Sequence, residues 1–286
     1  MKKILSLTLV IALIVILFVA SFFIPFRPTS KTNQSKIRVM VTIPPQAEFV
    51  KKVGGERVQV TVMVPPGYNP HTYEPKPSQL KEVEKAEIYF ALGSGIDFEV
   101  AWLSKLREIN RKMLVVNCSE GVQMIDRDPH VWLSPRNVEI MVGHVYEGLV
   151  QVDPANEKYY RENLEAYLQE LDVLNREIEA LFSNVTNRIF IAYHPSWGYF
   201  ARDYNLTQIP IEKEGKEPTA ASIAALIEQA KRLNVKVVVV SPQFNVKSAE
   251  VVAEEIGGKI VLADPLAEDY VNNLRSVALR LSEAMS

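Results

Sequence analysis

The sequence has little cysteine, little histidine and almost no net charge. These scarcities exclude a disulfide framework, give no sign of a nucleic-acid partner and leave few candidate histidine ligands. A single cysteine, Cys118, excludes an internal disulfide framework, and without a second thiol we expect it to be a small buried side chain. A formal net charge of −2 lacks the basic excess of nucleic-acid binders, so we expect no nucleic-acid partner. Only four histidines occur, so each of them can be weighed as a candidate ligand.

Residues 4–24 form a long apolar run directly after Lys2 and Lys3, as in export signals. The run is long enough to span a bilayer, and no A-x-A-like cleavage site follows, so we favour a retained anchor over cleavage. No cysteine follows it, which excludes lipid attachment there, and residues 25–35 are expected to be a flexible stalk. We therefore expect an exported chain on the extracytoplasmic face of the membrane, anchored or secreted through this segment.

From residue 37 onward, short β-branched runs alternate with amphipathic segments, which is typical of βα units and a parallel sheet. A first series has expected strands at residues 37–43, 58–64, 88–91 and 113–116, and expected helices at 46–53, 77–85 and 98–106. A second series has expected strands at residues 188–192, 235–240 and 259–262, and expected helices at 197–202, 220–233, 248–256 and 270–284. The expected fold class is α/β, and 286 residues are enough for two lobes that each bury a core.

Between the two series, apolar residues are spaced by three or four from Tyr160 to Leu181, the period of an amphipathic helix. Asp153-Pro154 provides an N-cap followed by proline, so we predict one helix over residues 154–182, about 40 Å long. Because the second series begins directly after it, we interpret it as a helix that bridges two lobes. The expected division is residues 1–35 for the signal or anchor with its stalk, 36–153 for the N-terminal lobe, 154–184 for the bridging helix and 185–286 for the C-terminal lobe.

Three of the four histidines lie in proline-bounded loops next to predicted strands or helices. His71 lies in PPGYNPHTYEP, His130 in DPHVWLSP and His194 in AYHPSWGYF. Ligands bind at the carboxyl ends of strands in open α/β sheets, and neutral imidazole is the commonest metal ligand in proteins. His144, in the middle of the helical segment MVGHVY, is expected to be a partly exposed helix residue. The other three are therefore the candidate metal ligands.

A zinc ion takes four ligands, so a fourth is needed. Asp264 directly follows the predicted strand at residues 259–262, the same kind of position that His194 occupies. Its carboxylate is the candidate fourth ligand.

A secreted zinc-dependent hydrolase is the alternative, because three histidines with an open position are also a catalytic pattern. The sequence has no H-E-x-x-H, and the candidate general bases, Glu74, Glu214 and Glu217, are also explained as solvated loop residues. A siderophore or vitamin site on the same fold would need a wide aromatic or basic cleft rather than three histidines.

The segments PPGYNPHTYEPKPS, DPHVWLSP, AYHPSWGYFARDYNL and VLADPLAEDY, in that order, resemble the metal-binding substrate-binding proteins of ABC importers, the ZnuA and TroA types of cluster A-I. The resemblance runs from about residue 37 to the C-terminus. It implies two Rossmann-like lobes joined by one long helix, with the metal in the cleft between them. His71 and His130 would come from the first lobe, and His194 and Asp264 from the second.

The resemblance also implies a function. Such a protein is a monomer and not an enzyme; it captures a divalent metal ion as its transported ligand and delivers it to an ABC permease in the membrane. Imidazole suits zinc and carboxylate-rich sites suit manganese, so zinc is favoured and manganese comes next.

Two departures from the family pattern affect the expected site. Residues 120–128 are short and contain no histidine, unlike the His-rich loop of many zinc members, so no auxiliary metal-collecting loop is expected. Ser241-Pro242-Gln243 stands where members often have Glu-Pro-Gln, and this leaves Asp264 as the better fourth ligand.

Overall fold

The computed structural model describes residues 36–212, 215, 217–244 and 247–286. The apolar run at residues 4–24 and the expected stalk lie outside these residues. Lys36–Ser286 form one compact unit. Within the described part of the chain, no helix is both long enough and apolar enough to cross a membrane.

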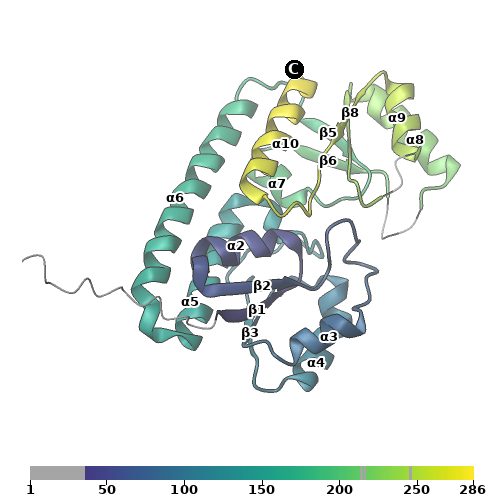
Figure 1. The fold of residues 1–286 in the computed structure, drawn as a ribbon. Helices are drawn as coiled ribbons and strands as arrows, with labels where there is room; N and C mark the ends of the chain where they lie inside the picture. Colours follow the sequence, from purple (N-terminus) through teal and green to yellow (C-terminus); the bar gives the residue numbers. More distant parts are fainter. Residues whose placement is uncertain (1–35, 213–214, 216, 245–246) are drawn as a thin grey trace, which may run out of the picture. The chain divides into compact units, whose positions relative to one another are not determined.

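The first half contains a parallel four-stranded sheet with the order β2-β1-β3-β4 (Figure 1). Its strands are β1 (Ile37–Val41), β2 (Val58–Val62), β3 (Ile88–Ala91) and β4 (Leu114–Asn117). Its helices are α2 (Pro44–Gly54), α3 (Pro77–Val83), α4 (Asp97–Ile109) and α5 (Pro135–Val152), with short 3-10 turns at Gly55–Arg57 and Val131–Leu133. Side chains alternate across the strands, so Val39 and Val41 enter one core while Met40 enters another on the opposite face.

The second half repeats this arrangement with the strand order β6-β5-β7-β8. Its strands are β5 (Ile189–Ala192), β6 (Thr207–Pro210), β7 (Val237–Val240) and β8 (Lys259–Leu262). Its helices are α7 (Gly198–Asp203), α8 (Ala220–Arg232), α9 (Lys247–Ile256) and α10 (Tyr270–Met285). Strand β6 was not predicted, because its sequence TQIP contains two polar residues and ends in Pro210, which an edge strand tolerates. The expected α/β class with two parallel-sheet lobes is confirmed.

The long helix α6 (Glu157–Phe182) begins three residues later than predicted, because Pro154–Asn156 form a separate 3-10 turn. It packs against α2 and α5 of the first half and against α10 of the second, and Figure 1 shows it running alongside both. Its buried side chains are Tyr160, Tyr167, Leu171, Leu174, Ile178 and Phe182. They belong to one continuous core that contains residues of both halves. The lobe boundaries at residues 153 and 184 stay a prediction.

A buried carboxylate joins the two halves beside this helix. Glu48 of α2 accepts hydrogen bonds from the Tyr167 hydroxyl of α6, at 2.9 Å, and from the backbone N–H of Tyr270, which starts α10. Burial raises the pKa of Glu48, and both hydrogen bonds oppose that rise. Three helices from distant parts of the sequence are thereby held together at one point.

Candidate metal centre

The candidate ligands all lie beyond the carboxyl ends of strands. His71 lies in the loop after β2, His130 in the loop after β4, and His194 two residues after β5. Two of these loops are fixed by short turns: the backbone N–H of His71 donates to Asn69 Oδ1, and that of His130 donates to Asp128 Oδ1, each at 2.9 Å. The fold therefore brings loops from both halves to one place, as expected for parallel sheets.

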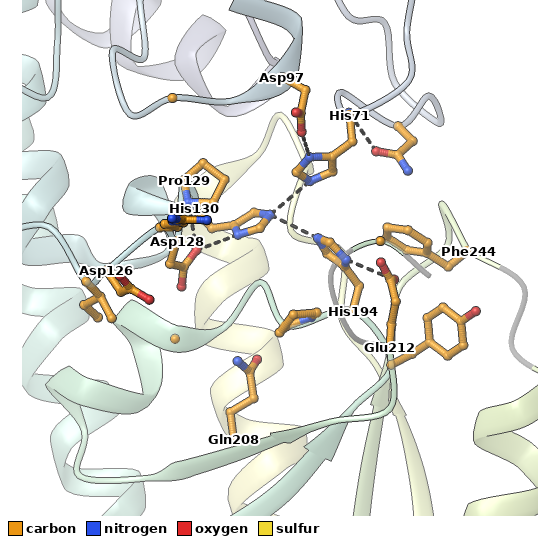
Figure 2. A pocket seen from close by; sticks show the side chains of 18 of the residues that line it. His71, Asp97, Asp126, Asp128, Pro129, His130, His194, Gln208, Glu212 and Phe244 are labelled. Carbon is orange, nitrogen blue, oxygen red and sulfur yellow. Dashed lines mark hydrogen bonds and ion pairs between the residues drawn. The ribbon is translucent and has the colours of Figure 1, made fainter. Parts of the chain in front are cut away.

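The three imidazoles converge on one point, as Figure 2 shows. One nitrogen from each of His71, His130 and His194 lies within 4.8 Å of the others. The Nε2 atom of His130 is 3.4 Å from that of His71 and 3.2 Å from that of His194. A tetrahedral zinc with Zn–N bonds of about 2.0–2.1 Å separates its ligands by about 3.3–3.4 Å. These two separations match the spacing that zinc requires.

A carboxylate contacts the outward-facing Nδ1 of each imidazole. The three pairs are His71 with Asp97 at 2.6 Å, His130 with Asp128 at 2.7 Å, and His194 with Glu212 at 3.1 Å (Figure 2). An ionised carboxylate only accepts hydrogen bonds, so each Nδ1 carries the proton. Each Nε2 then presents a lone pair to the centre, the tautomer that a metal ligand needs.

Burial keeps two of these imidazoles neutral. It lowers the pKa of His130, against the opposing effect of Asp128. Burial, together with the nearby His130 and His71, lowers the pKa of His194 to about 2. At neutral pH these rings hold no proton on Nε2, so unshared lone pairs face one another at about van der Waals distance. A cation between them relieves that repulsion.

The centre is closed on one side and open on the other. The His194 ring stacks on Phe244, with ring centroids 4.6 Å apart and an interplanar angle of 21°. The side chain of His71 is 21% exposed and that of its partner Asp97 is 66% exposed, against 6% for His130. A cleft of about 690 Å³ is lined by residues of both halves, including all three histidines. The edge formed by His71 and Asp97 is therefore the accessible side of the centre.

Asp264 does not join the group. Among the described residues, only the three histidines bring ligand atoms this close together. Asp264 Oδ1 instead accepts hydrogen bonds from Gln243 Nε2, at 2.7 Å, and from the backbone N–H of Leu266, at 2.9 Å. These two donors hold the carboxylate in its own loop, so its part as the fourth ligand stays a prediction.

The three supporting carboxylates were not identified from the sequence. Asp128 had a local signal, since it stands two residues before its histidine in Asp-Pro-His. Asp97 is the first residue of α4, and Glu212 follows the unpredicted strand β6, so both reach their histidines only through the fold. His144 lies on α5, where it contacts Glu147 and the Glu120 carbonyl and stands apart from the centre.

The candidate bases of a hydrolase have other surroundings. Glu217 accepts a hydrogen bond from the Tyr193 hydroxyl at 3.2 Å, Glu74 is exposed, and Glu214 lies outside the described residues. The alternative of a secreted zinc-dependent hydrolase is not supported.

Two parallel-sheet lobes with a three-histidine centre at the carboxyl ends of their strands define a metal-binding solute-binding protein. The chain belongs to the family described as ZnuA, zinc-uptake complex component A, periplasmic, whose profile matches residues 39–284. The family supplies the substrate-binding components of metal ABC importers and is not a class of enzymes.

Characterised relatives and solved structures agree with this assignment. The chain is 28% identical to the high-affinity zinc uptake system protein ZnuA of Bacillus subtilis over 83% of its length and 81% of the relative's. It is also 28% identical to the manganese ABC transporter substrate-binding lipoprotein PsaA of Streptococcus anginosus, over 83% and 84% of the two chains. A crystal structure of ZnuA is 44% identical with a TM-score of 0.85, covering 88% of this chain and all of that one.

Proposed function

We propose that this chain captures one divalent metal ion, zinc ahead of manganese, and passes it to the permease of an ABC importer. The observation that carries the proposal is the convergence of three imidazole nitrogens, with the Nε2 atom of His130 at zinc-ligand spacing from the Nε2 atoms of His71 and His194. Names of relatives add support, because one is a zinc uptake protein and another a manganese transporter component.

The donor set favours zinc. Three imidazole nitrogens suit zinc better than manganese, and the general order of affinities places zinc above manganese at most nitrogen and oxygen sites. The fourth coordination position is completed by water or by Asp264. The three carboxylates that hold the Nδ1 atoms raise the basicity of the ligands, which strengthens binding of either ion.

The proposed place of action is the extracytoplasmic face of the membrane. The family description is periplasmic, and the relative from Streptococcus anginosus is named a lipoprotein. In this chain the one cysteine, Cys118, is buried in the first half, so the proposed anchor is the apolar run at residues 4–24. We further propose that the chain acts as a monomer and has no nucleic-acid partner.

A zinc titration against a competing chelator tests the capture step. The purified chain, without a His-tag, is expected to bind one zinc, and His71→Gln, His130→Gln and His194→Gln are each expected to weaken binding strongly. His144→Gln is the matched control, because it removes a histidine from α5 outside the centre. Loss of binding in the control variant alone would overturn the assignment.

A growth experiment tests delivery. Cells that lack the gene are expected to grow poorly under zinc limitation, and the wild-type chain is expected to restore growth where His130→Gln does not. Full rescue by His130→Gln would contradict a transport role for the centre.

A further inference from the structure

We propose that Gln243 sets the metal preference of the centre by holding Asp264 outside the three-histidine group. The proposal rests on the proposed function, since it concerns which metal that centre selects. It assigns a specificity role to a residue that need not itself coordinate the ion.

The two side chains come from neighbouring strands. Gln243 follows β7 and Asp264 follows β8, and the strands pair in parallel with Val240 opposite Leu262. The residues after them therefore emerge side by side, and Gln243 Nε2 donates to Asp264 Oδ1 at 2.7 Å. The Leu266 N–H, at 2.9 Å, binds the same oxygen from within the loop. Of these two restraints, only the Gln243 bond comes from a side chain that a substitution can remove.

Gln243 also lines the small cavity at the metal centre. This cavity, about 10 Å³ in volume, is bounded by the three histidines together with Gln243 and apolar side chains that include Trp132 and Leu266. That volume is about the space of one water molecule. Asp264 is not among the residues that line it. Gln243, and not Asp264, therefore lies with His194 among the residues that bound this cavity.

One atom of Gln243 lacks a partner. Its Oε1 is buried and accepts no hydrogen bond from any described residue, which is uncommon for a buried polar atom. Among the described residues, the Gln243 amide therefore makes one side-chain hydrogen bond, the bond from Nε2 to Asp264.

These contacts decide between two coordination shells. With Asp264 held by Gln243, the ion meets three nitrogens and a water, a four-coordinate shell that suits zinc. With Asp264 released, a carboxylate adds one or two hard oxygens, which favours the oxygen-rich, higher coordination that manganese accepts. Gln243 therefore favours zinc over manganese.

The test is a double-substitution cycle on the full chain, with ZnCl₂ and MnCl₂ titrated separately against a chelator. Gln243→Leu keeps a similar volume but removes the amide, and it is expected to lower the zinc-over-manganese affinity ratio on the order of tenfold, a typical effect of a residue that orients a ligand. Gln243→Leu combined with Asp264→Asn is expected to restore the ratio, because the released carboxylate is gone. Gln151→Leu, at an exposed position of α5, is the control and should leave the ratio unchanged.

The outcomes separate this proposal from the proposed function. Two results overturn the role of Gln243 but leave the proposed function intact, provided that the wild-type chain binds zinc. The first is an unchanged zinc-over-manganese affinity ratio in Gln243→Leu. The second is a lowered ratio that persists when Asp264→Asn is added. A wild-type chain that binds neither ion overturns both proposals. If Gln243→Leu does not fold, Gln243→Asn replaces it, since the shorter amide cannot span the 2.7 Å contact and the same outcomes apply.

Discussion

The Trp132 indole N–H donates a hydrogen bond to the backbone carbonyl of Pro265 at a distance of 2.7 Å, and so joins the segment after His130 to the segment after Asp264. The Trp132 ring is fully buried, and its centroid lies 5.3 Å from that of the His130 imidazole. This contact fixes a ligand from the first half against the loop that carries the predicted fourth ligand of the second.

Trp132→Phe is expected to destabilise the fold through this bond. Leaving the buried Pro265 carbonyl without its donor costs about 1–3 kcal/mol of unfolding free energy. The matched control is Trp197→Phe, because Trp197 is equally buried but its Nε1 has no partner among the described residues. Urea denaturation should show a larger loss of unfolding free energy for Trp132→Phe than for Trp197→Phe. Equal losses in the two variants would mean that the hydrogen bond to Pro265 contributes nothing beyond packing.

Bound zinc is expected to stabilise the folded chain. The ligands lie as far apart in sequence as His71 and His194, so unfolding destroys the centre. With free zinc at about 1,000 times the dissociation constant, mass action contributes about 4 kcal/mol. Thermal melting should shift upward with ZnCl₂ and return after addition of a chelator. An unchanged melting temperature at saturating zinc would contradict the proposed metal centre.

The metal-free chain is expected to lose stability in acid because of His130 and His194. Burial lowers the pKa of both below the unfolded value of about 6.5, to about 2 for His194. Below about pH 6.5 the unfolded chain binds protons that the folded chain excludes, so stability falls as the pH drops from there toward the folded pKa, by up to about 1.4 kcal/mol per unit for each group.

Urea denaturation with a chelator present, between pH 7.5 and pH 5, measures this dependence. His194→Gln should make the dependence shallower, whereas His144→Gln should leave it as it is. An unchanged slope in His194→Gln would show that this imidazole is not protected from protons in the folded chain.

His194→Glu is expected to narrow the preference for zinc over manganese. The change replaces a borderline-soft nitrogen with hard oxygen and adds one negative charge. Zinc should still bind better in absolute terms, so the expected change is in the ratio of the two affinities. His144→Glu introduces the same charge on α5 and serves as the control. A shift in the ratio for His144→Glu but not for His194→Glu would contradict the placement of the third ligand.

The sequence predicted those features of the site that depend on local pattern. His71, His130 and His194 were named as candidate ligands because proline-bounded loops and strand periodicity are visible along the chain; the structure brings them together, and their part as metal ligands stays a prediction. The partners of His71 and His194 were not, because Asp97 and Glu212 lie 26 and 18 residues from them, and their contacts depend on tertiary packing.

The same limit applies to Asp264 and to the fold. The sequence predicted that Asp264 follows the strand β8. It could not predict the hydrogen bond from Gln243 to the Asp264 carboxylate, because that bond depends on strands β7 and β8 lying side by side. The edge strand β6 reads TQIP, without the β-branched apolar run of the other strands, and the turn at Pro154–Asn156 continues a proline-led helical start. Periodicity therefore placed the strands with β-branched runs and missed the one that contains polar residues and a proline.

X-ray absorption at the zinc edge of the zinc-loaded chain tests the central claim most directly, because it counts the ligands around the ion. The predicted spectrum shows three imidazole nitrogens at about 2.0–2.1 Å and no sulfur. His130→Gln should remove one imidazole from that shell, and His144→Gln should remove none. A wild-type spectrum with fewer than three imidazoles, or with a sulfur ligand from Cys118, would contradict the account.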